Sequence, residues 1–138
     1  MFGTFQQSQL RIEVPASANV LNRSLTHIPS LREWLMPLPL ESGLPESLTP
    51  GLIFHSGWGI ISVAHQVNCV GENHLRLLLS QGVDGFHEWT WGDGWVQSRL
   101  EGISLLSLNL AQSLCLWRLK QYAIKIDSPT MSTYQPNA

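Results

Sequence analysis

The chain has 138 residues, of which 43% are hydrophobic and 13% are charged, so it is too apolar to be disordered and has the length of one globular domain. Eight Lys and Arg against ten Asp and Glu give a formal net charge of −2, which excludes the basic balance typical of nucleic-acid binding. The two cysteines, Cys69 and Cys115, lack the spacing of zinc ligands or of a disulfide framework, so neither is predicted.

The beginning of the chain predicts a cytoplasmic protein. Its first ten residues, MFGTFQQSQL, have no basic start followed by an apolar core, as a signal peptide would have. The most apolar segment, residues 103–126, is interrupted by polar and charged side chains, whereas a membrane span needs about 20 predominantly apolar residues. We therefore expect no membrane span.

The first predicted elements are a strand and two short helices. Residues 9–14 alternate between polar and apolar side chains, which is the period of a half-buried strand, and Pro15 ends it. Ser17 is a suitable N-cap for a short helix, and Pro29 suits the first turn of a second helix over residues 30–36.

A proline-rich segment precedes a series of predicted strands. Four prolines and a glycine between Pro37 and Pro50 prevent a continuous helix and weaken any strand prediction. Between Gly51 and Gly102, four or five antiparallel strands are predicted from turn signals at residues 57–59, 71–73, 82–85 and 92–94.

One face of this sheet is predicted to be apolar. The odd positions of the first two long strands carry most of the apolar side chains, namely Ile61, Val63, Val67, Cys69, Leu75, Leu77 and Leu79. His65 interrupts this face, and His87, Trp89 and Trp91 share one face of a later strand. We expect these imidazoles and indoles on the concave side of a curved sheet.

The last predicted element is a helix over residues 103–126, about 36 Å long at about 1.5 Å per residue. One apolar stripe of this helix should cover the sheet, and it consists of Leu105, Leu108, Leu116, Leu119, Ala123 and Ile126. A second stripe, on nearly the opposite side, consists of Leu106, Leu110, Leu114 and Trp117. Either the leucines of residues 37–50 cover this outer stripe, or a second copy of the chain covers it in a symmetric homodimer.

The domain is predicted to span residues 8–126. Residues 1–7 are then an N-terminal extension, and residues 127–138 lack periodicity and form a mobile tail.

This order of elements resembles the START-like helix-grip superfamily, also called SRPBCC. The residues that carry the resemblance are Ile12-x-Val14-Pro15-Ala16-Ser17, Val20, Leu31 to Trp34, Gly57-Trp58, Trp89-x-Trp91 and the closing helix from Ile103. The resemblance implies an α+β fold in which a curved antiparallel sheet grips a long C-terminal helix. It also implies a cavity between them, which in many relatives holds a lipid, a polyketide, a steroid or another apolar molecule. The sequence departs from the pattern after Trp34, where relatives usually have a second long strand.

Seven residues are candidate ligand contacts. An imidazole in an apolar cavity can act as an acid or a base or donate a hydrogen bond to a ligand carbonyl, although such a residue is more often a buried side chain bonded to a backbone carbonyl. Tryptophans suit both pocket walls and core filling. The predicted ligand-binding residues are His65, His87, Trp58, Trp89, Trp91, Leu77 and Leu110.

Three functions are compatible with these features. We favour the binding or transport of a small apolar ligand without catalysis, since no nucleophile, carboxylate pair, metal site or cofactor motif is recognisable. The first alternative is an enzyme of the cyclase or dehydratase type that moves a proton with His65 or His87. The second is an interaction adaptor with a collapsed cavity that binds a protein partner through the outer stripe. The sequence leaves open whether any reaction is catalysed.

Overall fold

Six strands form one antiparallel sheet in the described part of the chain, which comprises residues 3–35, 40–57 and 62–127 of this computed structural model. The strands lie in the order β1-β6-β5-β4-β3-β2, so the first strand pairs with the last. Their bounds are β1 Thr4–Glu13, β2 Ile53–Ser56, β3 Val63–Gly71, β4 His74–Gln81, β5 Asp84–Gly92 and β6 Trp95–Ser104. The predicted series of antiparallel strands is confirmed.

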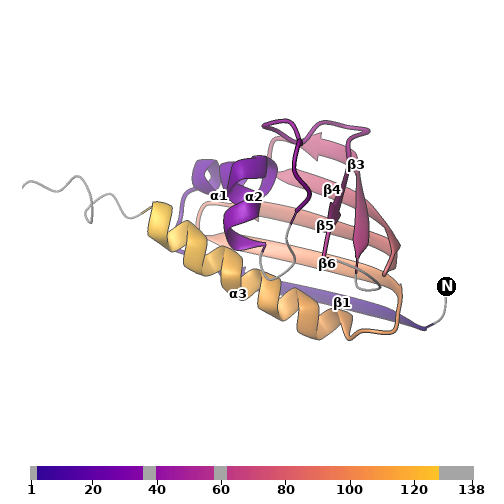
Figure 1. Ribbon diagram of the computed structural model, residues 1–138. Coiled ribbons are helices and arrows are strands. Elements are labelled where there is room, and N and C mark those ends of the chain that lie inside the picture. Colours follow the sequence, from indigo (N-terminus) through magenta and orange to yellow (C-terminus); the bar gives the residue numbers. More distant parts are fainter. Residues whose placement is uncertain (1–2, 36–39, 58–61, 128–138) are drawn as a thin grey trace, which may run out of the picture.

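The helices lie on one side of the curved sheet (Figure 1). α3, Leu108–Ile126, packs along β1 and β6, while α1, Ala18–Thr26, and α2, Ile28–Trp34, cover one end. This α+β architecture, with a sheet around a long C-terminal helix, is the predicted one. None of the helices in the described ranges is long and apolar enough to cross a membrane.

Local sequence signals explain how the two short helices begin. Ser17 caps α1 as predicted, because its Oγ accepts a hydrogen bond from the Val20 N–H at 3.2 Å. Pro29 lies in the first turn of α2, where its missing N–H is not needed. α2 begins at Ile28, two residues earlier than predicted.

β1 begins at Thr4, five residues before the predicted strand, so residues 4–7 of the predicted N-terminal extension belong to the sheet. The alternating pattern fails here because side chains directed at α3 are polar. Gln6 accepts a hydrogen bond from the Leu108 N–H at 2.9 Å, and the Ser8 hydroxyl donates to Gln112 at 2.6 Å. The inward positions of this part of β1 are therefore filled by polar side chains that hydrogen-bond to α3, and the alternation of apolar and polar residues that predicts a half-buried strand is absent.

The closing helix is shorter than predicted. It begins at Leu108 instead of residue 103, because Ile103 and Ser104 continue β6 and pair with β1. The helix start is set by Ser107, whose Oγ accepts a hydrogen bond from the Leu110 N–H at 3.2 Å. Leu105, expected on the sheet-facing stripe, precedes the helix and is exposed.

A register shift in β3 moves one predicted core residue to the surface. The pairing of β3 with β4 shifts between Val67 and Cys69, and a bulge of this kind reverses which side chains face the core. Cys69 is exposed, whereas Val70 packs partly buried against the core opposite Leu75. On the neighbouring strand β4 the predicted inward positions are confirmed, since Leu75, Leu77 and Leu79 are buried.

The outer stripe of α3 is uncovered in the described part of the structure. Leu110, Leu114 and Trp117 on α3, and Leu106 just before the helix, are 45–71% exposed. Leu40, Leu44 and Leu48, offered as a cover for this stripe, instead pack against the core. Residues 128–138 of the predicted tail and Leu38 lie outside the described ranges.

A pair of glycines allows β5 and β6 to approach each other closely. Gly85 pairs with Gly102, and a Cβ atom on Gly85 would overlap the Glu101 carbonyl oxygen and the Gly102 Cα atom. The opposing atoms belong to the backbone, so no side-chain rotation relieves the overlap. Gly102, which the sequence pattern placed at the end of a strand, therefore lies inside β6.

We expect Gly85→Ala to lower the free energy of unfolding by about 3 kcal/mol, because the backbone of β6 must move to admit the methyl group. Gly71→Ala is the matched control, since its Cβ would meet the His74 Cβ at an ordinary 3.5 Å. Urea denaturation of both variants measures the difference. Equal stability of the two variants would contradict the close approach of the strands.

Candidate functional site

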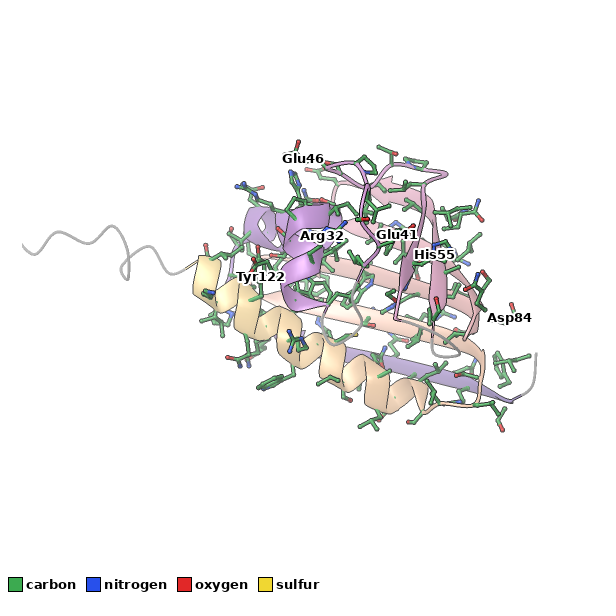
Figure 2. All side chains as sticks on the ribbon, viewed as in Figure 1. Arg32, Glu41, Glu46, His55, Asp84 and Tyr122 are labelled. Atoms are coloured by element: carbon green, nitrogen blue, oxygen red, sulfur yellow. The ribbon has the colours of Figure 1, made fainter. Side chains whose placement is uncertain are left out.

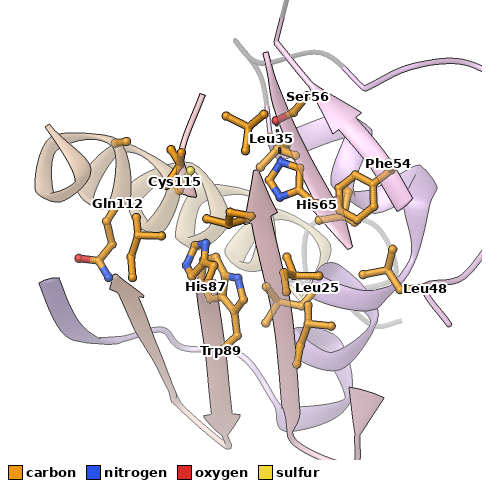
Figure 3. A pocket seen from close by; sticks show the side chains of 18 of the residues that line it. Leu25, Leu35, Leu48, Phe54, Ser56, His65, His87, Trp89, Gln112 and Cys115 are labelled. Carbon is orange, nitrogen blue, oxygen red and sulfur yellow. Dashed lines mark hydrogen bonds between the residues drawn. The ribbon is translucent and has the colours of Figure 1, made fainter. Parts of the chain in front are cut away.

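A cavity of about 110 Å³ lies between the concave face of the sheet and the helices (Figure 3). Its wall is predominantly aliphatic and aromatic, with contributions from α1, α2, α3 and the five strands β2 to β6. Trp34 and Trp89 meet edge to face on this wall with ring centroids 6.1 Å apart. The polar side chains on it are Ser56, His65, His87 and Gln112.

Four of the seven predicted contact residues line the cavity, namely Leu77, His65, His87 and Trp89. Trp91 is 1% exposed and belongs to the packed core instead. Leu110 lies on the outer stripe of α3 and does not line the cavity, because the helix turns this position away from the sheet. Trp58 lies outside the described residues.

His65 is held between β2 and β3. Its Nε2 lies 2.8 Å from the Ser56 Oγ, and its ring stacks on Phe54 with centroids 4.7 Å apart and planes 4° apart. The cross-strand register places Phe54 opposite His65. Burial, together with a smaller effect of His55, lowers the pKa of His65 to about 4.

His87 is held by a chain of side-chain hydrogen bonds from α3. Its Nε2 lies 2.6 Å from the Ser98 Oγ, which accepts a hydrogen bond from the Gln112 Nε2 at 2.9 Å. The imidazole also stacks on Trp89, with centroids 4.4 Å apart. Burial, with a smaller effect of His65, lowers the pKa of His87 to about 3.

Gln112 was missed by the sequence analysis. It is 1% exposed and occupies the helical position between Leu108 and Leu116, on the stripe that faces the sheet. The signal that could have identified it is a single polar residue at i+4 within an otherwise apolar helix face. Ser56 was also missed, because β2 is short and follows the proline-rich segment.

The wall of the cavity carries no charged side chain among the residues described. Cys115 also lines it, and burial raises the pKa of its thiol to about 11, so this group is neutral too. Figure 2 shows charged groups such as Glu46 and Asp84 at the periphery of the molecule. No three His, Cys, Asp or Glu side chains in the described ranges are arranged to hold a metal ion.

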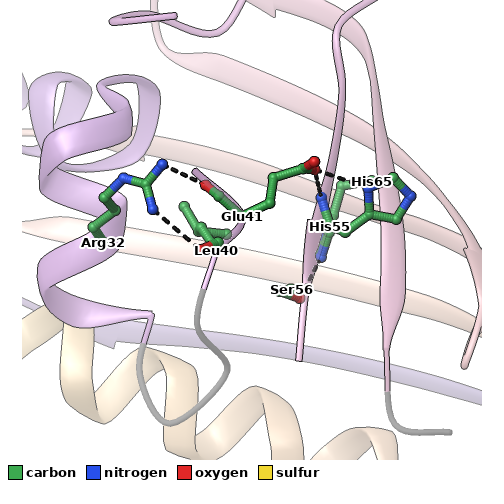
Figure 4. Close-up of polar contacts among 6 residues, drawn as sticks. All are labelled: Arg32, Leu40, Glu41, His55, Ser56 and His65. Atoms are coloured by element: carbon green, nitrogen blue, oxygen red, sulfur yellow. Dashed lines mark hydrogen bonds and ion pairs between the residues drawn. The ribbon is translucent and has the colours of Figure 1, made fainter. Parts of the chain in front are cut away.

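A set of polar contacts fixes the segment before β2 beside the cavity (Figure 4). The Arg32 guanidinium on α2 donates to the backbone carbonyls of Leu40 and Glu41. Glu41 in turn accepts hydrogen bonds from the backbone N–H of His55 at 2.7 Å and from its Nδ1 at 2.8 Å. Because Leu40 also forms a β-bridge with Ser56, these contacts position the hydroxyl that meets His65.

No protein-family model and no curated protein sequence matches the chain. Solved structures do match it. DynU16, from the dynemicin biosynthetic locus, aligns with a TM-score of 0.62 and 17% identity over 84% of this chain, which spans 46% of the length of DynU16. Major latex-like protein 151 from Panax ginseng aligns with a TM-score of 0.68 and 8% identity, over 91% of this chain and 99% of that one.

A third similar structure is the Aha1 dimer from Colwellia psychrerythraea, with a TM-score of 0.59 and 12% identity over 86% of this chain and 96% of that one. At these identities the likeness concerns the fold alone. It confirms the helix-grip fold that the sequence resemblance implied.

We expect acidification to destabilise the protein before its carboxylates titrate. Between about pH 6.5 and pH 4 the unfolded chain binds protons on His65 and His87 that the folded chain does not, because their folded pKa values are about 4 and about 3. The contribution of the two neutral histidines to the free energy of unfolding is therefore fully present above about pH 6.5. As the pH drops below this value, the free energy of unfolding falls by up to about 1.4 kcal/mol per pH unit for each histidine. Urea denaturation at pH 7, 6 and 5 measures the slope.

The double variant His65→Gln/His87→Gln should lose most of this pH dependence. A wild-type protein that is as stable at pH 5 as at pH 7 would show that the two imidazoles are solvated.

Proposed function

We propose that this protein binds a small apolar molecule in the cavity between the sheet and α3, in the cytoplasm, and carries it without chemical change. The observation that supports this proposal is the composition of the cavity wall. It combines aliphatic and aromatic side chains with a few fixed polar groups, which is the usual composition of a small-molecule site.

The volume of the cavity favours a compact ligand. Sites for drug-sized molecules are typically about 300–1,000 Å³, whereas an apolar cavity of about 150 Å³ can hold a benzene ring. At about 110 Å³, this cavity suits a molecule of roughly one six-membered ring in the conformation described. A larger ligand would require α2 or α3 to move away from the sheet.

The electrostatics of the cavity favour binding over proton transfer. A general acid or base works best when its pKa lies near the operating pH. With pKa values of about 4 and about 3, His65 and His87 are neutral at pH 7 and are weak bases. These values argue against the cyclase or dehydratase alternative, in which one of the two would have to move a proton.

The outer stripe of α3 supports a second, independent proposal, that the protein forms a symmetric homodimer through Leu106, Leu110, Leu114 and Trp117. All four side chains are exposed; Leu110, Leu114 and Trp117 lie at i, i+4 and i+7 on α3, and Leu106 lies just before it. Burying exposed apolar surface is the main driving force for association. The structurally similar Aha1 protein of Colwellia psychrerythraea is itself a dimer. Two-fold pairing is the commonest arrangement of identical subunits.

Toluene is a suitable probe of the cavity, and we expect Leu77→Phe to weaken its binding at least about tenfold, because the added ring occupies the ligand volume. Leu78→Phe is the matched control, since Leu77 is 6% exposed and lines the cavity whereas Leu78 is 37% exposed on the other face of β4. Methyl chemical shifts in an NMR titration measure the affinity. Absence of toluene binding to the wild type, or equal binding by both variants, would overturn the proposed cavity function.

For the dimer, we expect Leu110→Lys to halve the mass measured by light scattering, because a symmetric contact would bury two unpaired charges. Leu78→Lys makes the same chemical change on the outer face of the sheet and should leave the mass unchanged. A wild-type monomer, or a dimer that survives Leu110→Lys, would remove the outer stripe from the interface.

A further inference from the structure

Three side chains on the outer face of the sheet bring a thiol, an imidazole and a carboxylate together, away from the cavity. The Cys69 Sγ lies 3.7 Å from the His74 Nδ1, which is within the range of a hydrogen bond to sulfur. The Nε2 of the same ring lies 2.9 Å from the Glu88 Oε2. Cys69 is exposed, and the side chains of His74 and Glu88 are 33% and 23% exposed. The thiol is therefore accessible to molecules in solution.

The bulge in β3 creates this cluster. Because the pairing with β4 shifts between Val67 and Cys69, Cys69 lies opposite Arg76 and turns outward instead of toward the core. His74 precedes Arg76 by two residues on β4, so it is a diagonal neighbour of Cys69, and long side chains reach such neighbours. Glu88 lies opposite Arg76 on β5. Three adjacent strands thus contribute one side chain each.

The carboxylate of Glu88 determines which nitrogen of His74 carries the proton. The hydrogen bond to His74 is the largest of the effects that lower the pKa of Glu88 from its ordinary value, so this group is ionised at pH 7. An ionised carboxylate only accepts hydrogen bonds, so Nε2 of His74 is the donor, and in the neutral ring Nδ1 carries the lone pair. That lone pair faces the Cys69 thiol. His74 is thus positioned to take the proton of Cys69.

This order of groups is the one that activates cysteine nucleophiles in proteins. The thiolate is the reactive form, and an adjacent base that is itself oriented by a third group generates it. Arg76 helps to hold the third group, since its guanidinium lies 3.6 Å from the Glu88 carboxylate. His74 uses one ring nitrogen for Cys69 and the other for Glu88, so the three side chains do not converge on a point where a metal ion would bind.

The surroundings of Cys69 favour a small disulfide over an acyl compound as its reaction partner. Acyl transfer develops an oxyanion, which needs hydrogen-bond donors aimed at it, and a substrate that is turned over needs a pocket. Cys69 lines none of the main cavities in the described ranges. Exchange with a disulfide is a displacement at sulfur that develops no oxyanion, and it requires only an accessible thiolate.

We propose that Cys69 is a modification site that forms a mixed disulfide with a low-molecular-weight disulfide, with His74 as the base and Glu88 as the positioning residue. The thiol proton moves to the His74 Nδ1, and the Cys69 sulfur attacks one sulfur of the disulfide. The old S–S bond breaks as the new one forms, and the leaving thiolate takes the proton from His74. Cys69 is oxidised and one thiol is released. The reverse exchange with a free thiol restores Cys69.

The test uses 2-hydroxyethyl disulfide in large excess, because this reagent is small and uncharged, and intact-mass spectrometry of acid-quenched samples gives the rate. Cys69→Ser measures the background from Cys115, the other cysteine of the chain, whose pKa is raised by burial to about 11. Cys69→Ser/Ser80→Cys is the control for exposure, since Ser80 is exposed on the same face of β4 and lies opposite Ala64. We expect the wild type at pH 7 to react at least about tenfold faster than this control.

The role of the imidazole is tested with His74→Gln at pH 7 and at pH 10. At pH 7 we expect this variant to react at least about tenfold more slowly than the wild type, because the base is lost. At pH 10 we expect similar rates, because an ordinary thiol, with a pKa of about 8.5, ionises there without a base. The charged groups facing the site are Arg76 and Glu88, and guanidinium and carboxylate groups keep their charge over this range. Glu88→Gln should show the same pattern with a smaller loss at pH 7.

A wild type that is no faster than the control at pH 7 would refute the proposal, as would a Cys69→Ser variant that reacts as fast as the wild type. The proposal also fails if His74→Gln is as fast as the wild type at pH 7. If that variant is slower by the same factor at pH 10, His74 only shapes the strand and the proposed base is wrong. Should His74→Gln not fold, the comparison of the wild type with the exposure control still decides the question.

Discussion

The buried amide of Gln112 is the interaction on which the arrangement of the other parts depends. From α3 this side chain reaches the two paired strands β1 and β6, since it donates to the Ser98 carbonyl on β6 and accepts from the Ser8 hydroxyl on β1. A buried amide in an apolar interface is tolerated only where its hydrogen bonds are made, so it fixes one rotation and one position of the helix. The same amide orients Ser98 and, through it, His87. The register of the helix and the geometry of the cavity are therefore set by the same group.

Much of the fold could be predicted because its signals are local. Glycines and asparagine mark the turns between β3 and β6, Ser17 and Pro29 mark the helix starts, and alternation identifies the inward face of β4. Signals failed where tertiary contacts replaced local ones. The first residues of β1 were not predicted as a strand because their inward side chains are polar. The bulge in β3 turns Cys69 outward, and Gly102 allows β5 and β6 to approach each other instead of ending a strand. A bulge is set by pairing with the neighbouring strand, which periodicity along one strand does not encode.

The candidate site was predictable only in part. Strand parity placed His65, His87, Trp89 and Leu77 on the cavity wall, since parity depends on nothing more than counting along a strand. Gln112, Ser98 and Ser56, which fix the imidazoles, come from other elements, and only the tertiary fold brings them together. The cavity volume depends on how the side chains pack, and Trp91 shows that sharing a face with the cavity is not the same as lining it.

The pairing of β1 with β6 has a consequence for how the protein folds. Thr4 pairs with Ser104, so β1 cannot pair with β6 until the chain has been synthesised as far as residue 104. During synthesis, the hairpins from β3 to β6 can form in sequence, whereas β1 and α3 can only join them at the end. Folds dominated by such distant contacts fold slowly, because the chain entropy of closing the long loop is lost before the contacts compensate for it. We expect the cavity to take shape in this last step, since the wall supplied by α3 is missing until then.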